Sequence, residues 1–299
     1  MALDFKIGPA VIRLTSEFSL EPGLTELYQP FRYRGGEPPV LTLFIRRGPP
    51  PSFTGSRQRT VEAELEGSWR LYRSDDSCEL EILEQRAFRP RAVARIKESW
   101  EEVDFYRTPS FPVEKEPLTR AVAEILEPFA PWWVARWAAS KRRGLILHGS
   151  AVAWDGRGLA FIGPSGAGKT TIARLFLEET KAEILNDERI FLWRHESGWR
   201  VSGTPWAGML RKASSLSVPL ARIFFLKKGP QNQIASLPPL SVATRLVSES
   251  FLPLWDRDGM EGVSELSGKI SGEVPCAEFE FLKDISAIHY LDEAVTVLR

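Results

Sequence analysis

One glycine-rich segment strongly constrains the local fold of the chain. Gly163 to Thr170 fits the pattern G-x-x-x-x-G-K-[ST] at every position. An apolar run, residues 159–162, precedes it, and residues 170–180 follow with apolar side chains on one side, as in an amphipathic helix. A strand, a glycine-rich turn and a helix in this order predict a phosphate-binding P-loop. The alternative, a chance glycine-rich turn, does not explain why both flanks are present.

Each position of this segment has a physical role in holding a nucleoside triphosphate. Glycines let backbone N–H groups turn toward phosphate oxygens, and the following helix adds the positive end of its dipole. Lys169 would place its charge on the β- and γ-phosphates, and the Thr170 hydroxyl is suited to Mg²⁺. We therefore expect ATP and Mg²⁺ as cofactors. The predicted binding residues are Gly163, Pro164, Ser165, Gly166, Ala167, Gly168, Lys169, Thr170 and Thr171.

An acidic pair follows the next predicted strand. Asn186-Asp187-Glu188 follows residues 184–185, and Asp187 comes eighteen residues after Lys169. A carboxylate at the C-terminal end of a neighbouring strand faces the phosphate crevice, where it can hold Mg²⁺ or accept the proton of an attacking hydroxyl. ABC-type and motor ATPases place their acidic strand much further along the chain. The short gap therefore favours a kinase with a small or flexible acceptor over a solvated acidic turn.

The first part of the chain has a different pattern of apolar and charged residues. Apolar and charged residues alternate at 61–66, 69–72 and 79–82, which predicts half-exposed antiparallel strands. Asp75-Asp76-Ser77 predicts a hairpin turn between two of them. We interpret residues 1–115 as a smaller β-rich domain that recognises the substrate or mediates assembly.

Residues 116–143 are predicted to form a helical connector. Pro128 and Pro131 interrupt its apolar pattern, so we expect two short helices. Its tryptophans could form a ligand platform, but packing between the two domains is the favoured interpretation; they are Trp132, Trp133 and Trp137.

From residue 144 to residue 299, strands and helices alternate, which predicts an α/β domain around the P-loop. Strands are expected at residues 145–147, 152–154, 159–162, 184–185, 190–192, 222–226 and 277–282. Helices are expected at residues 170–180, 240–250 and 285–298.

Composition limits the partners. Lys plus Arg and Asp plus Glu are both 39, and this balance argues against a nucleic-acid binder. The basic stretch 141–143 is better explained as a solvated helix end. The chain shows no secretory signal and no apolar run long enough to cross a membrane, which predicts a cytoplasmic protein without a membrane partner. Its two cysteines, Cys78 and Cys276, predict neither a disulfide scaffold nor a zinc site.

Three segments together resemble a known family. They are His148-Gly149-Ser150-Ala151-Val152, the P-loop, and Asp187-Glu188. In this order they look like the catalytic core of the HPr kinase/phosphorylase family, which is related to ATP-dependent phosphoenolpyruvate carboxykinases. Residues 203–208, 220–237 and 274–281 are similar to HPr-kinase-like proteins of peptide-modification gene clusters. The resemblance covers roughly the C-terminal 155 residues and implies a mixed sheet in the P-loop domain.

The resemblance also implies roles for individual residues. Asp187 would be the general base for the acceptor hydroxyl, Glu188 would bind Mg²⁺ with Thr170, and His148 would lie near the transferring phosphate. A structural histidine is the equal alternative for His148. The family's acidic pair is commonly Asp-Asp, whereas the second member here is Glu188. The segment Gly203 to Trp206 also differs from the glycine-arginine loop of true HPr kinases, which argues against HPr itself as the substrate.

Three functions follow from these expectations. The favoured one is an ATP- and Mg²⁺-dependent kinase that phosphorylates a serine or similar hydroxyl of a peptide or protein. The alternatives are a kinase of a small metabolite, such as an amino acid or sugar, and a nucleotide-binding regulatory protein with little catalysis. Arg211 could steady the γ-phosphate, although a plain surface arginine is the favoured interpretation. A homo-oligomer is possible in each case.

Overall fold

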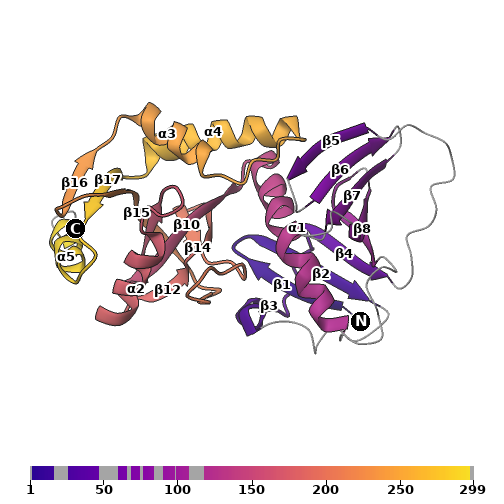
Figure 1. The fold of residues 1–299 in the computed structure, drawn as a ribbon, viewed down its shortest axis with the longest axis horizontal. Helices are drawn as coiled ribbons and strands as arrows, with labels where there is room; N and C mark the ends of the chain where they lie inside the picture. Colours follow the sequence, from indigo (N-terminus) through magenta and orange to yellow (C-terminus); the bar gives the residue numbers. More distant parts are fainter. Residues whose placement is uncertain are drawn as a thin grey trace. The chain divides into compact units, whose positions relative to one another are not determined.

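The computed structural model describes residues 2–16, 26–46, 60–65, 69–74, 77–83, 90–97, 99–107 and 118–296. The chain divides into two compact units, which Figure 1 shows in a gradient from indigo to yellow. The first unit contains residues 1–6 and 10–134, and the second contains residues 7–9 and 135–299. One helix, α1, contributes residues to both units.

The first unit is built on a nine-stranded sheet in the order β3-β1-β2-β4-β9-β8-β7-β6-β5. The β2–β4 and β4–β9 pairs are parallel, and the run from β9 to β5 is antiparallel. The predicted antiparallel strands correspond to β5, β6 and β7 and are confirmed. Asp75 and Asp76 lie outside the described residues, but Ser74 pairs with Ser77 across the connection. The strands are β1 (Ala2–Ile7), β2 (Ala10–Ser16), β3 (Arg32–Tyr33), β4 (Leu41–Arg46), β5 (Thr60–Leu65), β6 (Trp69–Ser74), β7 (Ser77–Leu83), β8 (Pro90–Ile96) and β9 (Glu102–Arg107), and a 3-10 helix spans Glu26–Phe31.

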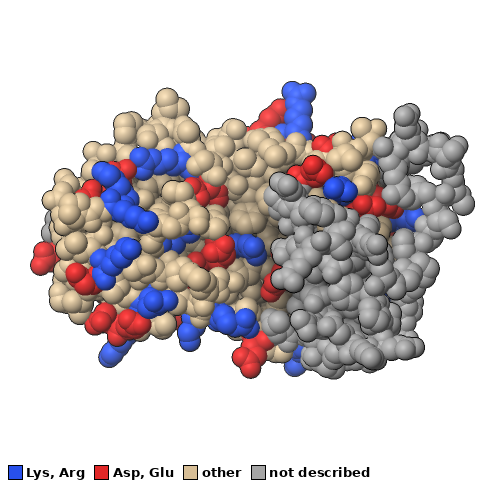
Figure 2. Space-filling view, viewed as in Figure 1, with Lys and Arg blue, Asp and Glu red and all other residues tan. Residues whose placement is uncertain are grey.

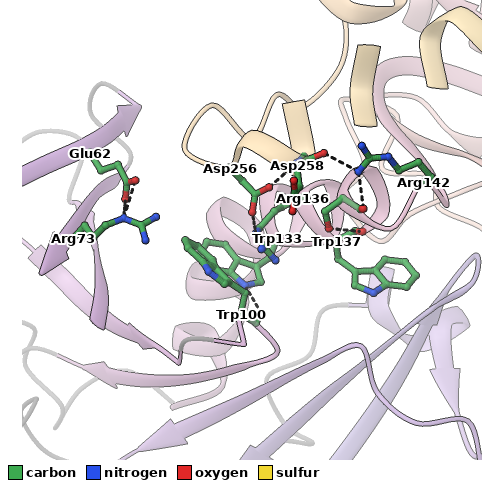
Figure 3. A network of polar contacts seen from close by, with 11 residues as sticks. Glu62, Arg73, Trp100, Trp133, Arg136, Trp137, Arg142, Asp256 and Asp258 are labelled. Atoms are coloured by element: carbon green, nitrogen blue, oxygen red, sulfur yellow. Dashed lines mark hydrogen bonds and ion pairs between the residues drawn. The ribbon is translucent and has the colours of Figure 1, made fainter. Parts of the chain in front are cut away.

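The connector is one continuous helix, α1 (Leu118–Ser140), with Pro128 and Pro131 inside it. The prediction of two short helices is therefore wrong. Each proline removes one backbone donor and crowds the preceding turn, but packing of the aromatic residues outweighs this local cost. Trp133 stacks on Phe129 at 4.4 Å between ring centroids, and its indole N–H donates to the Trp100 carbonyl at 3.1 Å (Figure 3). These tryptophan contacts lie within the first unit.

The end of α1 is anchored in the second unit, to the start of helix α4 (Arg257–Glu273). Arg136 forms a 2.5 Å ion pair with Asp256, the residue that caps α4, and the Arg142 guanidinium donates to the Asp258 carbonyl at 3.1 Å (Figure 3). The two helices cross closely, because a Cβ on Gly262 would lie 2.0 Å from the Ala139 carbonyl oxygen. The basic stretch 141–143 therefore includes an arginine that holds these two helices together.

The second unit contains an eight-stranded mixed sheet. Pairings of β11 with β10, β10 with β13, β13 with β14, β14 with β15, and β15 with β11 close a ring of five strands. Beyond the ring, β17 and then β16 follow β15, and β12 pairs with β10. The strands are β10 (Gly144–Trp154), β11 (Arg157–Ile162), β12 (Glu183–Asn186), β13 (Arg189–His195), β14 (Gly198–Ser202), β15 (Ser217–Lys228), β16 (Gln233–Ser236) and β17 (Cys276–Phe281).

Two strands were expected where the structure has the single strand β10, and this expectation is wrong. The polar residues at its centre remain extended because the strand changes partners there. Residues up to His148 pair with β13, and residues from Gly149 onward pair with β11. His148 therefore lies at the point where β10 passes from one neighbour to the other.

Helices cover both faces of this sheet. Alternate strand residues enter two separate cores, as Phe224 and Phe225 of β15 illustrate. One core includes residues of α3 (Pro239–Ser248) and α4, and the other includes residues of α2 (Lys169–Glu179) and α5 (Ser286–Thr296). The expected α/β architecture is confirmed at this level, whereas α4 was not predicted.

The parallel strands of the second unit end at one edge of the sheet. β15 runs parallel to β11 and to β17, and β12 pairs antiparallel with β10, as β11 does. The carboxyl ends of these strands therefore lie together, which is where ligands bind in α/β sheets.

Figure 2 shows acidic and basic side chains interspersed over the described part of one face. Within the described ranges, no helix is long and apolar enough to span a bilayer.

Candidate functional site

The glycine-rich segment connects β11 to α2, as predicted for a P-loop. Gly166 and Gly168 have φ values of +77° and +112°, a region that residues with a Cβ rarely adopt. A Cβ on Gly168 would also lie 2.7 Å from the Phe281 ring, so glycine is required there for two reasons. The Ala167 N–H donates to the Pro164 carbonyl at 3.0 Å and closes the turn. Pro164 and Ser165 are exposed on the loop, and Thr170 and Thr171 are half-buried in the first turn of α2.

The side chain of Lys169 is held inside this loop. The residue is only 6% exposed, and its ammonium donates to the carbonyls of Gly163 at 2.6 Å and Pro164 at 3.1 Å. Burial lowers the pKa of Lys169, and the negative charges of Glu249 and Glu188 partly oppose this. No carboxylate forms an ion pair with it in the described part of the chain. The cation is therefore fixed by backbone oxygens, and its charge remains free to meet an anion.

The acidic pair begins at a tightly bonded turn after β12. The Asn186 side-chain oxygen accepts hydrogen bonds from the Glu188 N–H at 2.7 Å and the Arg189 N–H at 2.8 Å. Its side-chain nitrogen donates to the Thr204 carbonyl at 2.7 Å. Asn186 thus fixes the backbone from which the two predicted acidic residues project.

Asp187 is fully buried, and it binds another segment of the chain. One carboxylate oxygen accepts from the Gly208 N–H and the other from the Leu210 N–H, both at 2.9 Å. The segment packs directly on the carboxylate, since a Cβ on Gly208 would lie 2.8 Å from Oδ2. We name residues 206–210 the cover segment. In this conformation the cover segment separates Asp187 from solvent, so a role as general base requires the segment to move.

Glu188 and His148 lie together and are both accessible. The distance from His148 Nδ1 to Glu188 Oε1 is 3.6 Å, and about a third of each side chain is exposed, 34% and 33%. Burial and the positive charges of Lys169 and Arg189 lower the pKa of His148, while Glu188 opposes the shift. The neutral imidazole is therefore favoured near neutral pH. His148 and Glu188, two of the residues predicted to act beside Lys169, are thus close to each other.

Sequence reasoning missed one member of this cluster, Glu249. It follows the last residue of α3, and its carbonyl accepts the His148 N–H at 2.8 Å. Burial raises the pKa of its carboxyl group, and the charge of Lys169 opposes the shift. No local motif marks this residue, because its proximity to Lys169 arises from the tertiary contact between the end of α3 and β10. Arg211, considered as a γ-phosphate ligand, is exposed and follows the cover segment directly.

The oxygen atoms of Thr170 and Glu188 are of the kind that Mg²⁺ prefers. Within the described residues, no three His, Cys, Asp or Glu side chains converge to hold a metal by themselves. Mg²⁺ commonly uses only one or two protein oxygens and takes its other ligands from phosphates and water. Thr170 and Glu188 carry such oxygens. Thr170 follows Lys169 in the chain, and the charge of Glu188 acts on the pKa of Lys169.

One protein family is similar to part of the chain. The family described as "SynChlorMet cassette protein ScmC" matches residues 129–276. The match includes the glycine-rich segment 163–170, the acidic pair, the cover segment and Glu249, and it ends at the first residue of β17. No curated protein matches the chain.

Proposed function

We propose that this protein is an ATP- and Mg²⁺-dependent phosphotransferase that phosphorylates a serine or similar hydroxyl of a peptide or protein. The observation that carries the proposal is the arrangement around Lys169. A buried ammonium is held in a glycine-rich loop, and it interacts electrostatically with His148 of β10, with Glu188 after β12 and with Glu249 at the end of α3. Positioning and charge neutralisation supply most of the catalysis of phosphoryl transfer.

Each residue has a defined task in the proposed reaction. Lys169 and the N–H groups of the loop neutralise the charge on the phosphates. The acceptor oxygen attacks the γ-phosphorus, the bond from this phosphorus to the β–γ bridging oxygen breaks, and ADP leaves. Asp187 accepts the hydroxyl proton once the cover segment has opened. The neutral His148 offers a hydrogen bond to the transferring group.

Thr170 and Glu188 would hold the magnesium ion. When bound, Mg²⁺ supplies positive charge that neutralises phosphate oxygens. Glu188 has one more methylene than an aspartate, yet its carboxylate remains a suitable oxygen ligand.

The acceptor class rests on the resemblance to HPr-kinase-like proteins and on the short gap between Lys169 and Asp187. The matching family is described as a cassette protein, so we expect the acceptor among the products of neighbouring genes. The first unit would bind this acceptor or mediate assembly. A small hydroxy metabolite is the alternative acceptor, because the same catalytic groups would serve it.

One observation favours a second function, a nucleotide-binding regulatory protein with little catalysis. Both oxygens of Asp187 are already engaged by the cover segment. If the cover never opens, the proposed base cannot reach an acceptor, and bound ATP would control only the conformation of the protein.

The test is a radiolabelled-ATP assay with Mg²⁺ against the products of neighbouring genes and a panel of hydroxy metabolites. We expect label on a peptide or protein serine, and loss of transfer in Asp187→Asn with ATP still bound. Glu196→Gln, which changes an exposed turn residue, is the matched control and should transfer normally. Unchanged transfer in Asp187→Asn would remove the proposed base. ATP binding without any labelled acceptor would favour the regulatory function.

A further inference from the structure

A second lysine lies at the tip of the P-loop. β15 pairs in parallel register with β11 up to Ile162 and Phe225, and then continues for three more residues beside the loop. The last of these is Lys228. Its ammonium nitrogen lies 3.8 Å from the position that a Cβ on Gly166 would occupy. A loop glycine without a side chain and a neighbouring ammonium therefore face each other at the phosphate-binding turn.

The neighbouring lysine on the same strand has a different environment. Lys227 lies 3.3 Å from a carboxylate oxygen of Glu280 and 3.6 Å from one of Glu278. The carboxylate of Glu280 is the main reason why the pKa of Lys227 is raised. Among the described residues, Lys228 forms no such ion pair, although both lysines are exposed. Successive strand residues point to opposite faces, so only the second lysine points toward the loop.

We propose that Lys228 is a second phosphate-binding cation, which contacts the phosphates of the nucleotide from the outer side of the loop tip. This inference rests on the proposed function, because it requires a nucleotide in the P-loop. Gly166 leaves an open path between the ammonium and the turn. A phosphate oxygen held by the N–H groups of the tip would come within a few ångströms of the lysine. Two unit charges interact appreciably at that distance, even when the site is partly solvated.

The geometry also separates the tasks of the two lysines. Lys169 is buried and bonded to the backbone of the loop, so it acts inside the turn. Lys228 is exposed and reaches the same loop from a different strand. A cation at an exposed site is screened by salt, so its contribution should weaken as ionic strength rises, whereas that of Lys169 should change less.

The experiment measures binding of ATP, ADP and AMP with Mg²⁺ to the full chain by isothermal titration calorimetry. Lys228→Met should weaken ATP and ADP binding about tenfold at low salt, and AMP binding much less. Lys228→Arg, which keeps the charge, should retain most of the affinity. Lys227→Met is the matched control and should remain within about twofold of the unchanged protein. Thermal unfolding of each variant shows whether it is folded.

The outcomes separate this inference from the proposed function. If the unchanged protein binds no nucleotide, both are overturned. If it binds ATP and Lys228→Met binds equally well, only the role of Lys228 is overturned. Equal weakening by Lys227→Met and Lys228→Met would show a general effect of surface charge and would also overturn the role of Lys228.

Discussion

The two units hold their buried charges in different ways. In the described part of the first unit, the buried charged residue is Glu79, at 4% exposure, and Arg95 lies opposite it with 3.7 Å between Nε and a carboxylate oxygen. The second unit buries Lys169 and Asp187, and both are bonded to the backbone. The first arrangement joins a charge to an opposite charge, and the second joins it to peptide groups.

This difference has a chemical consequence. An ion pair largely cancels the field of each partner. A backbone partner satisfies the hydrogen bonds of a charged group and leaves its net charge in place. Charge that is fixed in orientation and not neutralised is what stabilises developing charge in a reaction. The comparison therefore favours the second unit as the place of the proposed chemistry, independently of any motif.

The largest expected effect is that of Lys169→Met on ATP binding. Loss of the fixed cation should weaken binding about 100-fold or more, because truncating one member of a buried charge interaction costs several kcal/mol. Titration calorimetry with ATP and Mg²⁺ measures this. Glu79→Gln removes the buried charge of the first unit and should leave ATP affinity unchanged. If Lys169→Met and Glu79→Gln lost similar amounts of ATP affinity, the buried charges of the two units would not differ in the way proposed.

A smaller effect is expected on stability when Asp187 becomes Asn. The amide group would turn a donor toward the N–H of Gly208 or Leu210 and leave one buried group unsatisfied. We expect a loss of about 2–3 kcal/mol in the free energy of unfolding, measured in urea. Glu196→Gln should remain within about 0.5 kcal/mol. An equally stable Asp187→Asn protein would show that the cover segment is not held by this carboxylate.

The third prediction concerns pH and Glu249→Gln. Burial lowers the pKa of Lys169, and the charge of Glu249 opposes this. Without that charge the pKa of Lys169 falls further, so the ammonium loses its proton at a lower pH. The alkaline decline of ATP affinity should therefore begin at lower pH, with affinity a few-fold weaker at the alkaline end.

The control for this measurement is Glu261→Gln on the exposed side of α4, which should leave the pH profile of ATP binding in place. If the profile of Glu249→Gln coincides with that of the unchanged protein, the carboxylate does not act on Lys169.

The smallest effect is expected for Arg73→Met in the first unit. Its 2.8 Å ion pair with Glu62 (Figure 3) joins two strands at a partly exposed site. Such pairs contribute less than about 1 kcal/mol. Denaturant unfolding should show a change within this limit, and nucleotide affinity should not change. A loss of several kcal/mol would show that side-chain pairs in the first unit matter as much as the backbone-held charges.

Local patterns made much of the second unit predictable. The strand before the P-loop, the helix after it and the acidic pair at the end of β12 all follow from short stretches of sequence. α4 was missed because Gly259, Gly262, Gly268 and Gly272 lower its helix propensity. One of these glycines is needed where α4 meets the Ala139 carbonyl, and sequence alone does not show that contact.

Only the parts of the candidate site that are contiguous in the sequence could be predicted. The positions of Lys169 and Glu188 follow from motifs. The cover over Asp187 and the approach of Glu249 depend on contacts between distant parts of the chain. β10 was divided in two because its change of partner at His148 is a property of the sheet. A residue that joins a site through a tertiary contact from a distant element has no local sequence pattern that marks it.

The closed ring of strands limits where this unit can deform. The strand that leads into the P-loop has a bonded neighbour on each side, β10 and β15, and these are joined to each other through β13 and β14. Tilting that strand would shear several ladders at once, so the root of the loop behaves as a fixed base. Any closure around a nucleotide must then come from segments outside the ring of strands, above all residues 206–210, which lie over Asp187.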